Sequence, residues 1–147
     1  QIPYCVITIG QVKSANVRQK IFTELKSMQA ILPTIVAPTA YVSPTAKLGE
    51  GTIVMHQALV NAYAQVGDNC IVNSKALIEH DCVVANHCHV STSAVLNGEV
   101  LLGEGCLIGS GSILKQSVEL VDDVIIGAGS VVLNSVNKPG TYYGVVK

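Results

Sequence analysis

The residues of this chain best suited to proton transfer are four histidines, His56, His80, His87 and His89. Imidazole titrates close to neutral pH, so a neutral ring can accept a proton from an attacking nucleophile. Of the four, only His80 is followed directly by a carboxylate, that of Asp81. A neighbouring carboxylate can orient an imidazole and stabilise its protonated form. The pair is therefore a candidate general base, and a solvated pair at a turn is the alternative.

The elements that position these residues follow from a repeat of six. Sixteen consecutive hexads run without an insertion from Ala40 to Ser135. Their third place is always Val, Ile or Leu, and their first place is always Ala, Cys, Ser, Thr or Val. The fourth place is Gly in five hexads, and turn-tolerant residues fill many of the fourth to sixth places. Such a fixed period indicates a solenoid.

The hexad predicts a short strand followed by a corner. Side chains alternate along a strand, so the first and third places face the same interior. Gly, Asn, Asp and Ser then allow the chain to turn. Three such faces make one triangular coil of 18 residues, and the whole is a parallel β-helix. A period of six does not keep one face of an α-helix aligned, and a β-sandwich has strands of irregular length and spacing.

This register also assigns the cysteines. Four of the five, Cys70, Cys82, Cys88 and Cys106, occupy the small first place and are predicted to be buried apolar side chains. Cys5 lies in an apolar run and receives the same interpretation. An odd number of cysteines without an extracellular signature fits a reducing cytoplasm.

The register weakens an alternative zinc site. The row Cys82, His87, Cys88 and His89 resembles a ligand set in sequence, and a γ-carbonic-anhydrase-like zinc enzyme shares the coil. Zinc needs ligands that converge on one point. The two cysteines are predicted to face inward and His87 to lie at a turn, so the sequence predicts no metal.

The first 38 residues are expected to differ from the coils. Residues 4–9 are predicted to form a buried strand, Ser14 to cap a helix that runs to about Met28, and residues 31–37 to form a second apolar strand. So few elements cannot make an independent core. We expect residues 1–38 to be the end of an α/β, Rossmann-like domain whose earlier units lie upstream, and residues 39–147 to be the β-helix. A small cap on the open end of the coils is the alternative.

Composition excludes several classes of partner. The formal net charge is −1, and Arg18 is the only arginine, so no basic surface for nucleic acid is expected. No unbroken apolar stretch is long enough to span a bilayer.

The segment from Asn73 to Gly98 carries a more specific pattern. It has an Asn, then His-Asp-Cys seven residues later, then His-Val-Ser, and finally a Gly. With the hexads, this pattern resembles the hexapeptide-repeat acyltransferases, in the branch that acetylates sialic acids or UDP-linked 4-amino sugars in bacterial glycan synthesis. The resemblance implies a left-handed coil, acetyl-CoA as co-substrate, a nucleotide sugar held by the α/β domain, and a homotrimer with active sites between subunits.

The resemblance also implies residue roles. His80 matches the general base, Asp81 the carboxylate that raises its basicity, and His89 a histidine near the acetyl end of acetyl-CoA. Gly98, one coil beyond His80, matches a glycine whose N–H approaches the thioester carbonyl, although an ordinary turn glycine is the alternative. His56 and His87 have no matching role and are expected at the surface.

Binding residues are expected in a groove and near the acceptor. Small residues in one column, of which Ser110 and Ala128 lie between glycines, would let pantetheine lie against the backbone. Asn73 and Gly10 are the residues expected to contact the sugar substrate. The family commonly ends in a Gly-Val-Pro-Ala-Lys-like tail, whereas this chain has Val146 in place of Pro-Ala, so a role of the tail over CoA is not carried across.

The function predicted is acetyl transfer from acetyl-CoA to the 4-amino group of a UDP-linked deoxy amino sugar. The first alternative is O-acetylation of a sialic acid, which needs the same base and the same thioester. A non-enzymatic scaffold is a further alternative, because a β-helix can serve as a rigid spacer.

Overall fold

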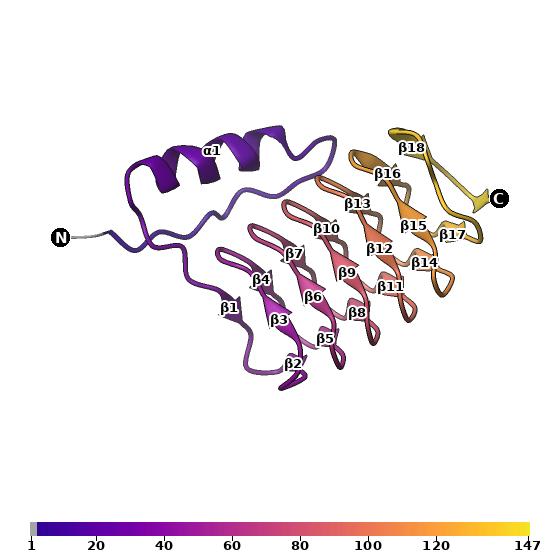
Figure 1. Ribbon diagram of the computed structural model, residues 1–147, viewed down its shortest axis with the longest axis horizontal. Helices are drawn as coiled ribbons and strands as arrows, with labels where there is room; N and C mark the ends of the chain where they lie inside the picture. Colours follow the sequence, from indigo (N-terminus) through magenta and orange to yellow (C-terminus); the bar gives the residue numbers. More distant parts are fainter. Residues whose placement is uncertain (1–2) are drawn as a thin grey trace.

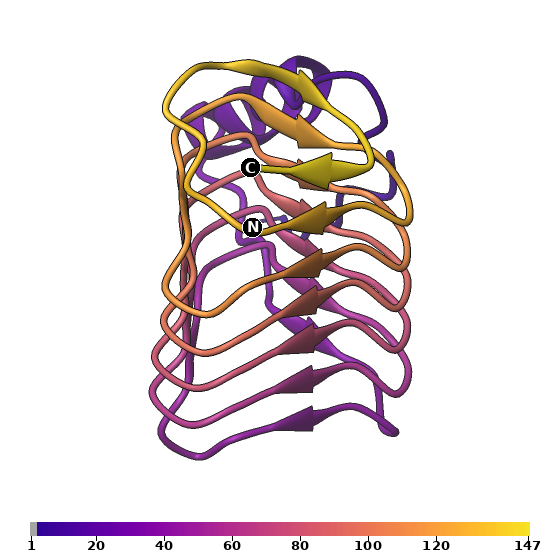
Figure 2. The same cartoon turned by 90° about the vertical axis from the view of Figure 1, so that its right-hand side faces the viewer.

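The computed structural model describes residues 3–147 and shows a parallel β-solenoid of about six turns with one helix along its side (Figures 1 and 2). Three flat sheets form the walls of the solenoid. Successive strands belong to different sheets, and each strand pairs with the strand one coil away. The parallel β-helix predicted from the hexads and the left-handed coil implied by the resemblance are both confirmed. Between Pro3 and Lys147, no helix is both long and apolar enough to cross a membrane.

The strands are short, and they define the three sheets. The first sheet contains β1 (Ile35–Val36), β4 (Ile53–Val54), β7 (Ile71–Val72), β10 (His89–Val90), β13 (Leu107–Ile108), β16 (Val124–Ile126) and β18 (Gly140–Tyr142). The second contains β2 (Tyr41–Val42), β5 (Leu59–Val60), β8 (Leu77–Ile78), β11 (Val95–Leu96), β14 (Ile113–Leu114), β17 (Val131–Val132) and β19 (Val145–Val146). The third contains β3 (Lys47–Leu48), β6 (Gln65–Val66), β9 (Val83–Val84), β12 (Leu101–Leu102) and β15 (Glu119–Leu120).

The predicted register holds through all sixteen hexads. Strands occupy the second and third places, and paired residues are one coil apart, as in the pairing of Ile71 with His89. The coil also extends beyond the predicted limits. Ile35 pairs with Ile53 one hexad before the predicted start, and Val145 pairs with Val131 near the C-terminus.

The solenoid interior is a continuous apolar column. Third-place residues such as Val60, Ile78 and Leu96 are fully buried. Each contributes about 1.5–3 kcal/mol relative to an exposed position. The four first-place cysteines are also buried, as predicted. Each thiol donates a hydrogen bond to a backbone carbonyl: Cys70 to Ala85, Cys82 to Asn97, Cys88 to Gly103 and Cys106 to Val121. Cys5 differs from its prediction, because it is only half-buried in the segment before the coils.

The row of cysteines and histidines does not converge. Cys82 and Cys88 face the interior, whereas the ring of His87 lies against Phe22, with 5.5 Å between ring centroids. Among the residues that the structure describes, no group of three or more His, Cys, Asp and Glu side chains could hold a metal ion.

The segment predicted as a buried strand is instead extended and mostly exposed. Its only bridge joins Tyr4 to Ile31, only Ile7 in residues 4–9 is buried, and Tyr4 is 75% exposed. A strand needs a continuous hydrogen-bonded neighbour, and within residues 3–147 this segment has none. Gln1 and Ile2, the start of the predicted α/β region, lie outside the described residues.

Helix α1 (Asn16–Ser27) is shorter than predicted and lies along the solenoid rather than over its open end (Figure 1). Ala15, not Ser14, is its N-cap, and the Ser14 hydroxyl accepts only a long hydrogen bond from the Asn16 N–H (3.4 Å). The helix packs on the corner between the third and first sheets, which we call the helix corner. There Phe22 lies close to Gly51 and Arg18 contacts Asn69.

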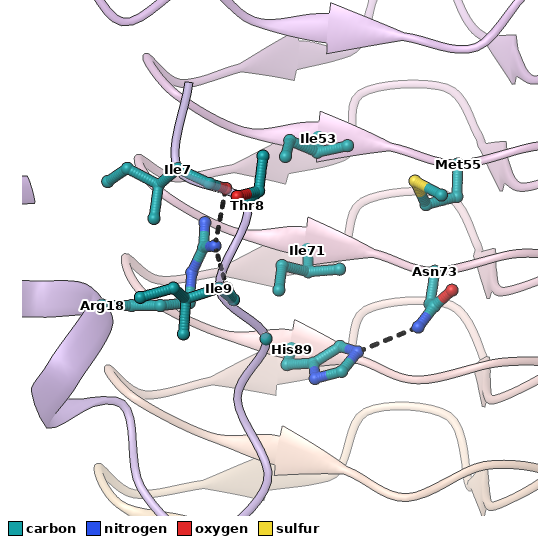
Figure 3. A pocket seen from close by; sticks show the side chains of 10 residues that line it. Ile7, Thr8, Ile9, Arg18, Ile53, Met55, Ile71, Asn73 and His89 are labelled. Atoms are coloured by element: carbon teal, nitrogen blue, oxygen red, sulfur yellow. Dashed lines mark hydrogen bonds between the residues drawn. The ribbon is translucent and has the colours of Figure 1, made fainter. Parts of the chain in front are cut away.

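Arg18 joins the three parts of this region. Its guanidinium is buried, and it donates to the carbonyls of Ile7 (3.1 Å) and Ile9 (2.6 Å) (Figure 3). It also donates to Oδ1 of Asn69 (2.7 Å). The extended segment, the helix and the coil are therefore fixed to one another. This arrangement holds residues 7–11 across the first sheet.

Candidate functional site

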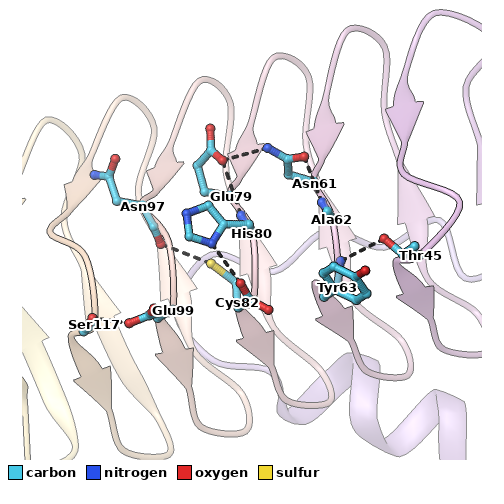
Figure 4. A network of polar contacts seen from close by, with 11 residues as sticks. Thr45, Asn61, Ala62, Tyr63, Glu79, His80, Cys82, Asn97, Glu99 and Ser117 are labelled. Carbon is cyan, nitrogen blue, oxygen red and sulfur yellow. Dashed lines mark hydrogen bonds and ion pairs between the residues drawn. The ribbon is translucent and has the colours of Figure 1, made fainter.

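The first part of the site is the corner between the second and third sheets, which we call the His80 corner (Figure 4). Strand β8 ends at Ile78 and β9 begins at Val83, so His80 lies on the turn between them. The backbone φ of Asp81 is +59°, in the left-handed region. This turn brings the Asp81 carboxylate back to Nδ1 of His80 at 2.9 Å, although neighbours in an extended strand would point apart.

The electrostatics of this corner favour a protonatable imidazole. The pKa of His80 is raised above its ordinary value, first by the hydrogen bond that its Nδ1–H donates to Asp81 and then by the charges of Asp81, Glu79 and Glu99. The His80 side chain is 48% exposed, so solvent and substrates can reach it. Since the Asp81 carboxylate accepts a hydrogen bond from Nδ1–H, the neutral ring presents its unprotonated Nε2 as a base.

Gly98 lies directly against the His80 ring. A Cβ atom at Gly98 would lie 2.6 Å from Cε1 and 2.7 Å from Nε2 of His80, so a larger residue would displace the imidazole. The predicted stacking of the two residues, one coil apart, is thus present. The structure explains the glycine by the space that the imidazole needs. The Gly98 N–H has no hydrogen-bond partner within residues 3–147, which leaves it free to donate to a substrate.

The second part of the site surrounds His89 on the first sheet. As predicted, this side chain leaves the core on the outer face of β10, but the N-terminal segment covers it and only 9% of the residue is exposed. Its Nδ1 lies 2.8 Å from the backbone oxygen of Gln11, and its Nε2 lies 3.2 Å from Nδ2 of Asn73. Burial lowers the pKa of His89, so the ring is neutral near neutral pH.

Two cavities meet at the pair His89 and Asn73. The larger, which we call the groove cavity, has a volume of about 400 Å³ and is also lined by Ser110 and Ala128. The smaller, of about 210 Å³, is lined mainly by apolar side chains together with Gly10 (Figure 3). Five residues predicted from the sequence as binding residues therefore line one or both of these adjoining cavities: Asn73, His89, Ser110, Ala128 and Gly10.

The groove cavity has unused backbone donors. Next to Gly49, Gly67 and Gly103, a fourth-place glycine leaves space for an Asp or Asn side chain of the next coil, as where Asp122 accepts the Glu104 N–H at 2.8 Å. At Gly109 the next coil supplies Ala128, which has no polar side chain. No described residue accepts the N–H of Ser110 or Ala128. These groups are available to the carbonyl oxygens of an extended ligand.

Within one chain, the two parts of the site lie at different corners of the prism. His80 is between β8 and β9, on the corner of the second and third sheets. Ser110 and Ala128 lie on the corner of the first and second sheets. Within one chain, the groove cavity and the candidate base are therefore on separate corners.

The structure adds three residues that the sequence did not single out as functional. Gln11 and Arg18 fix the N-terminal segment over the first sheet. Tyr143, 73% exposed, borders the groove cavity and packs so closely over Gly127 that a Cβ there would clash with its ring. A lone arginine in a weakly charged chain was a usable signal for Arg18, whereas no periodicity marks Gln11 or Tyr143.

The two remaining histidines lie at corners of the coil. His56 is exposed, as expected, and its Nδ1 lies 2.9 Å from Oγ1 of Thr39. His87 is not a free surface residue, because Phe22 and Asn69 cover it and burial lowers its pKa.

Comparison with known proteins gives matches among solved structures. No family model and no curated protein sequence matches the chain. PerB from Caulobacter crescentus, solved with CoA and GDP-perosamine, is 31% identical with a TM-score of 0.92, over 97% of this chain and 67% of that chain. The acetyltransferase domain of PglB from Neisseria gonorrhoeae, also solved with acetyl coenzyme A, is 33% identical with a TM-score of 0.88, over 90% of this chain and 65% of that chain.

A third structure shares the fold at lower identity. WeeI from Acinetobacter baumannii is 20% identical, with a TM-score of 0.86 over 97% of this chain and 68% of that chain. The chain spans about two thirds of the length of each of these proteins. The shared solenoid and the identity to PerB over nearly the whole chain establish the relationship. The chain belongs to the hexapeptide-repeat sugar N-acetyltransferase family.

Proposed function

We propose that this protein transfers the acetyl group of acetyl-CoA to the amine of a nucleotide-linked amino sugar. The observation that carries the proposal is the His80–Asp81 pair, with its free Nε2 beside the open N–H of Gly98. A base and an oxyanion donor at one corner are what acyl transfer from a thioester requires. The complexes of PerB with CoA and GDP-perosamine support both substrates.

In the proposed reaction the sugar amine attacks the thioester carbonyl. Its proton passes to Nε2 of His80, whose Nδ1–H is held by Asp81. The carbonyl oxygen carries negative charge in the tetrahedral intermediate, and the Gly98 N–H is a donor available to it. When the C–S bond breaks, the CoA thiolate leaves, and the proton that His80 took from the amine passes to this thiolate.

The groove cavity is the proposed site of the pantetheine arm. Its length along the coil, its small residues Ser110 and Ala128 and their unpaired N–H groups suit an extended chain of amides. Because Ser110 and His80 lie at different corners of one chain, we further propose a homotrimer in which the groove of one subunit faces His80 of the next.

The acceptor proposed is a UDP-linked 4-amino sugar, held in part by residues 1–38 as the end of an α/β domain, with Asn73 and Gly10 near the sugar. The identity of 31% to a protein solved with an amino sugar nucleotide favours an amine over a sialic acid hydroxyl. Parallel assays with UDP- and GDP-linked amino sugars and with sialic acid would test this. Turnover only with sialic acid would contradict it.

The central test replaces the base. The His80→Ala variant is expected to lose about 10²–10⁴-fold in turnover, the usual worth of a general base. The matched control is His56→Ala, because His56 also stands in the fifth place of its hexad and is exposed, but no carboxylate follows it. Near wild-type turnover for His80→Ala, with an unchanged melting temperature, would contradict the proposal.

The site between subunits can be tested by complementation. Ala128→Tyr is expected to block the groove, and His80→Ala to remove the base, so each variant alone is inactive. Mixed trimers contain some sites with an intact groove from one subunit and an intact base from the other. Co-expression should therefore restore a measurable fraction of the activity, with light scattering reporting the trimer. No recovery from mixed trimers would place both elements of a site in one chain.

A further inference from the structure

The hydrogen bonds around His89 determine which of its ring nitrogens carries the proton. The backbone oxygen of Gln11 can only accept, so the group that meets it at 2.8 Å must be Nδ1–H. The amide of Asn73 is oriented independently, because its Oδ1 accepts the N–H of Ser74 at 2.7 Å. Its Nδ2–H therefore faces Nε2 of His89, which accepts.

We infer that His89 presents a hydrogen-bond acceptor, Nε2, to the substrates, and that Gln11 is the positioning residue that fixes this tautomer. The inference rests on the proposed function and deepens it. A neutral ring with its proton on Nδ1 has no Nε2–H to give to a developing oxyanion. It can instead orient an N–H or O–H donor of a substrate at the junction of the two cavities.

Gln11 is held firmly enough to do this. Its side chain is buried, and its Nε2–H groups donate to the carbonyls of Gly105 (3.1 Å) and Cys106 (3.5 Å) on the helix corner. Its own Oε1 is buried and has no partner among the described residues, and the residue borders the groove cavity. Two acceptors, of which one has only Asn73 and the other none, therefore lie beside this cavity.

Two substrates carry a suitable donor. The pantetheine arm has amide N–H groups, and the acceptor sugar has its amine and hydroxyl groups. The common chemistry is a neutral donor that replaces Nδ2 of Asn73 at His89. Separate KM measurements for acetyl-CoA and for the sugar nucleotide distinguish the two sources.

The direct test is ¹⁵N NMR of histidine-labelled protein without any substrate. For His89 we expect a protonated Nδ1 and an unprotonated Nε2 at neutral pH, with the signals assigned by their loss in His89→Gln. Gln11→Ala should convert this into a mixture of tautomers, whereas Lys13→Ala, an exposed neighbour, should not. An Nε2–H tautomer or a charged ring in the wild-type protein would overturn the inference. This readout stands even if His80→Ala proves active, so it is separable from the proposed function.

A matched pair of variants extends the test to activity. His89→Asn keeps a donor near the Nδ1 position and loses the acceptor, while His89→Gln can place its amide oxygen near the Nε2 position. We expect His89→Asn to raise one of the two KM values about tenfold, as for one lost hydrogen bond, and His89→Gln to restore much of it. Unchanged KM values for both substrates in His89→Asn would refute the acceptor role.

Discussion

His80 and His89 are only nine residues apart, yet the fold gives them opposite properties. In each ring Nδ1–H donates a hydrogen bond to an oxygen at 2.8–2.9 Å, and Nε2 is left for another partner. At His80 that oxygen belongs to the Asp81 carboxylate and the ring is half-exposed, so the pKa is raised. At His89 the oxygen is the neutral backbone carbonyl of Gln11, in the segment that covers the ring, and burial lowers the pKa of His89. The comparison shows that the charge of the partner and the access of water, rather than the ring itself, decide which histidine can act as a base.

The sharpest way to break this comparison is to move the His80 ring without touching its charge. Gly98→Ala places a methyl group against Cε1 and Nε2. We expect about a 10²-fold loss of kcat, the cost of a small misplacement of a catalytic group. The backbone should tolerate the change, because Ala62 occupies the same place two coils earlier. Steady-state kinetics of Gly98→Ala would test this prediction, with Gln116→Ala, the next residue in the column, as the control. Unchanged activity of Gly98→Ala would contradict the arrangement.

A smaller effect is expected when the carboxylate at His80 is neutralised. Asp81→Asn keeps a residue that tolerates the left-handed backbone at this turn. The wild-type base must be neutral to act, so its raised pKa should put the acid limb of kcat/KM above pH 6.5, the ordinary value for histidine. In Asp81→Asn the limb should move to lower pH, with about tenfold lower activity on the plateau.

The same variant reports on stability with a defined sign. A raised folded-state pKa contributes stability that is present when His80 is protonated and is lost as pH rises through that value. Melting curves of the wild type and Asp81→Asn should therefore differ at pH values where His80 is protonated and converge at alkaline pH. A limb that stays in place in Asp81→Asn would show that the carboxylate does not tune the base.

The smallest effect is expected at the other histidine. Asn73→Ala removes the donor to Nε2 of His89 and leaves the His80 corner intact. A change of a few-fold in KM is expected, the worth of one neutral hydrogen bond, with no shift of the acid limb. The pH profile of kcat/KM for this variant is the measurement, and a displaced limb would mean that the two histidines titrate as one unit.

The repeating part of the molecule could be predicted from the sequence because its contacts recur at a fixed interval. The interval of 18 residues placed Gly98 against His80 and Ser110 beside Ala128 in the same column, and the first-place rule buried four cysteines. The contacts that helix α1 and the segment before it make with the coil follow no period. The bond between Gln11 and His89 joins residues 78 apart, and the bond between Arg18 and Asn69 joins residues 51 apart.

For the same reason the predicted strand at residues 4–9 was wrong. An apolar run predicts burial only if a neighbour covers it, and here most of the side chains in the run stay exposed. Such non-local contacts leave no local pattern in the sequence, so the shielding of His89 could be found only in three dimensions.

The unpaired N–H groups at Ser110 and Ala128 have a consequence for how such a protein can change. At Glu104 the coil supplies its own acceptor, the Asp122 carboxylate, so a ligand carbonyl in the groove would take the place of a side chain that the coil could itself supply. The donor of Ser110 is open because Ala128, one coil further on, has no polar side chain to accept it. A single substitution, Ala128→Asp, would therefore place a carboxylate within reach of the Ser110 N–H, where it would compete with a ligand. The reverse substitution at another corner, such as Asp122→Ala, would open a new binding position without altering the coil.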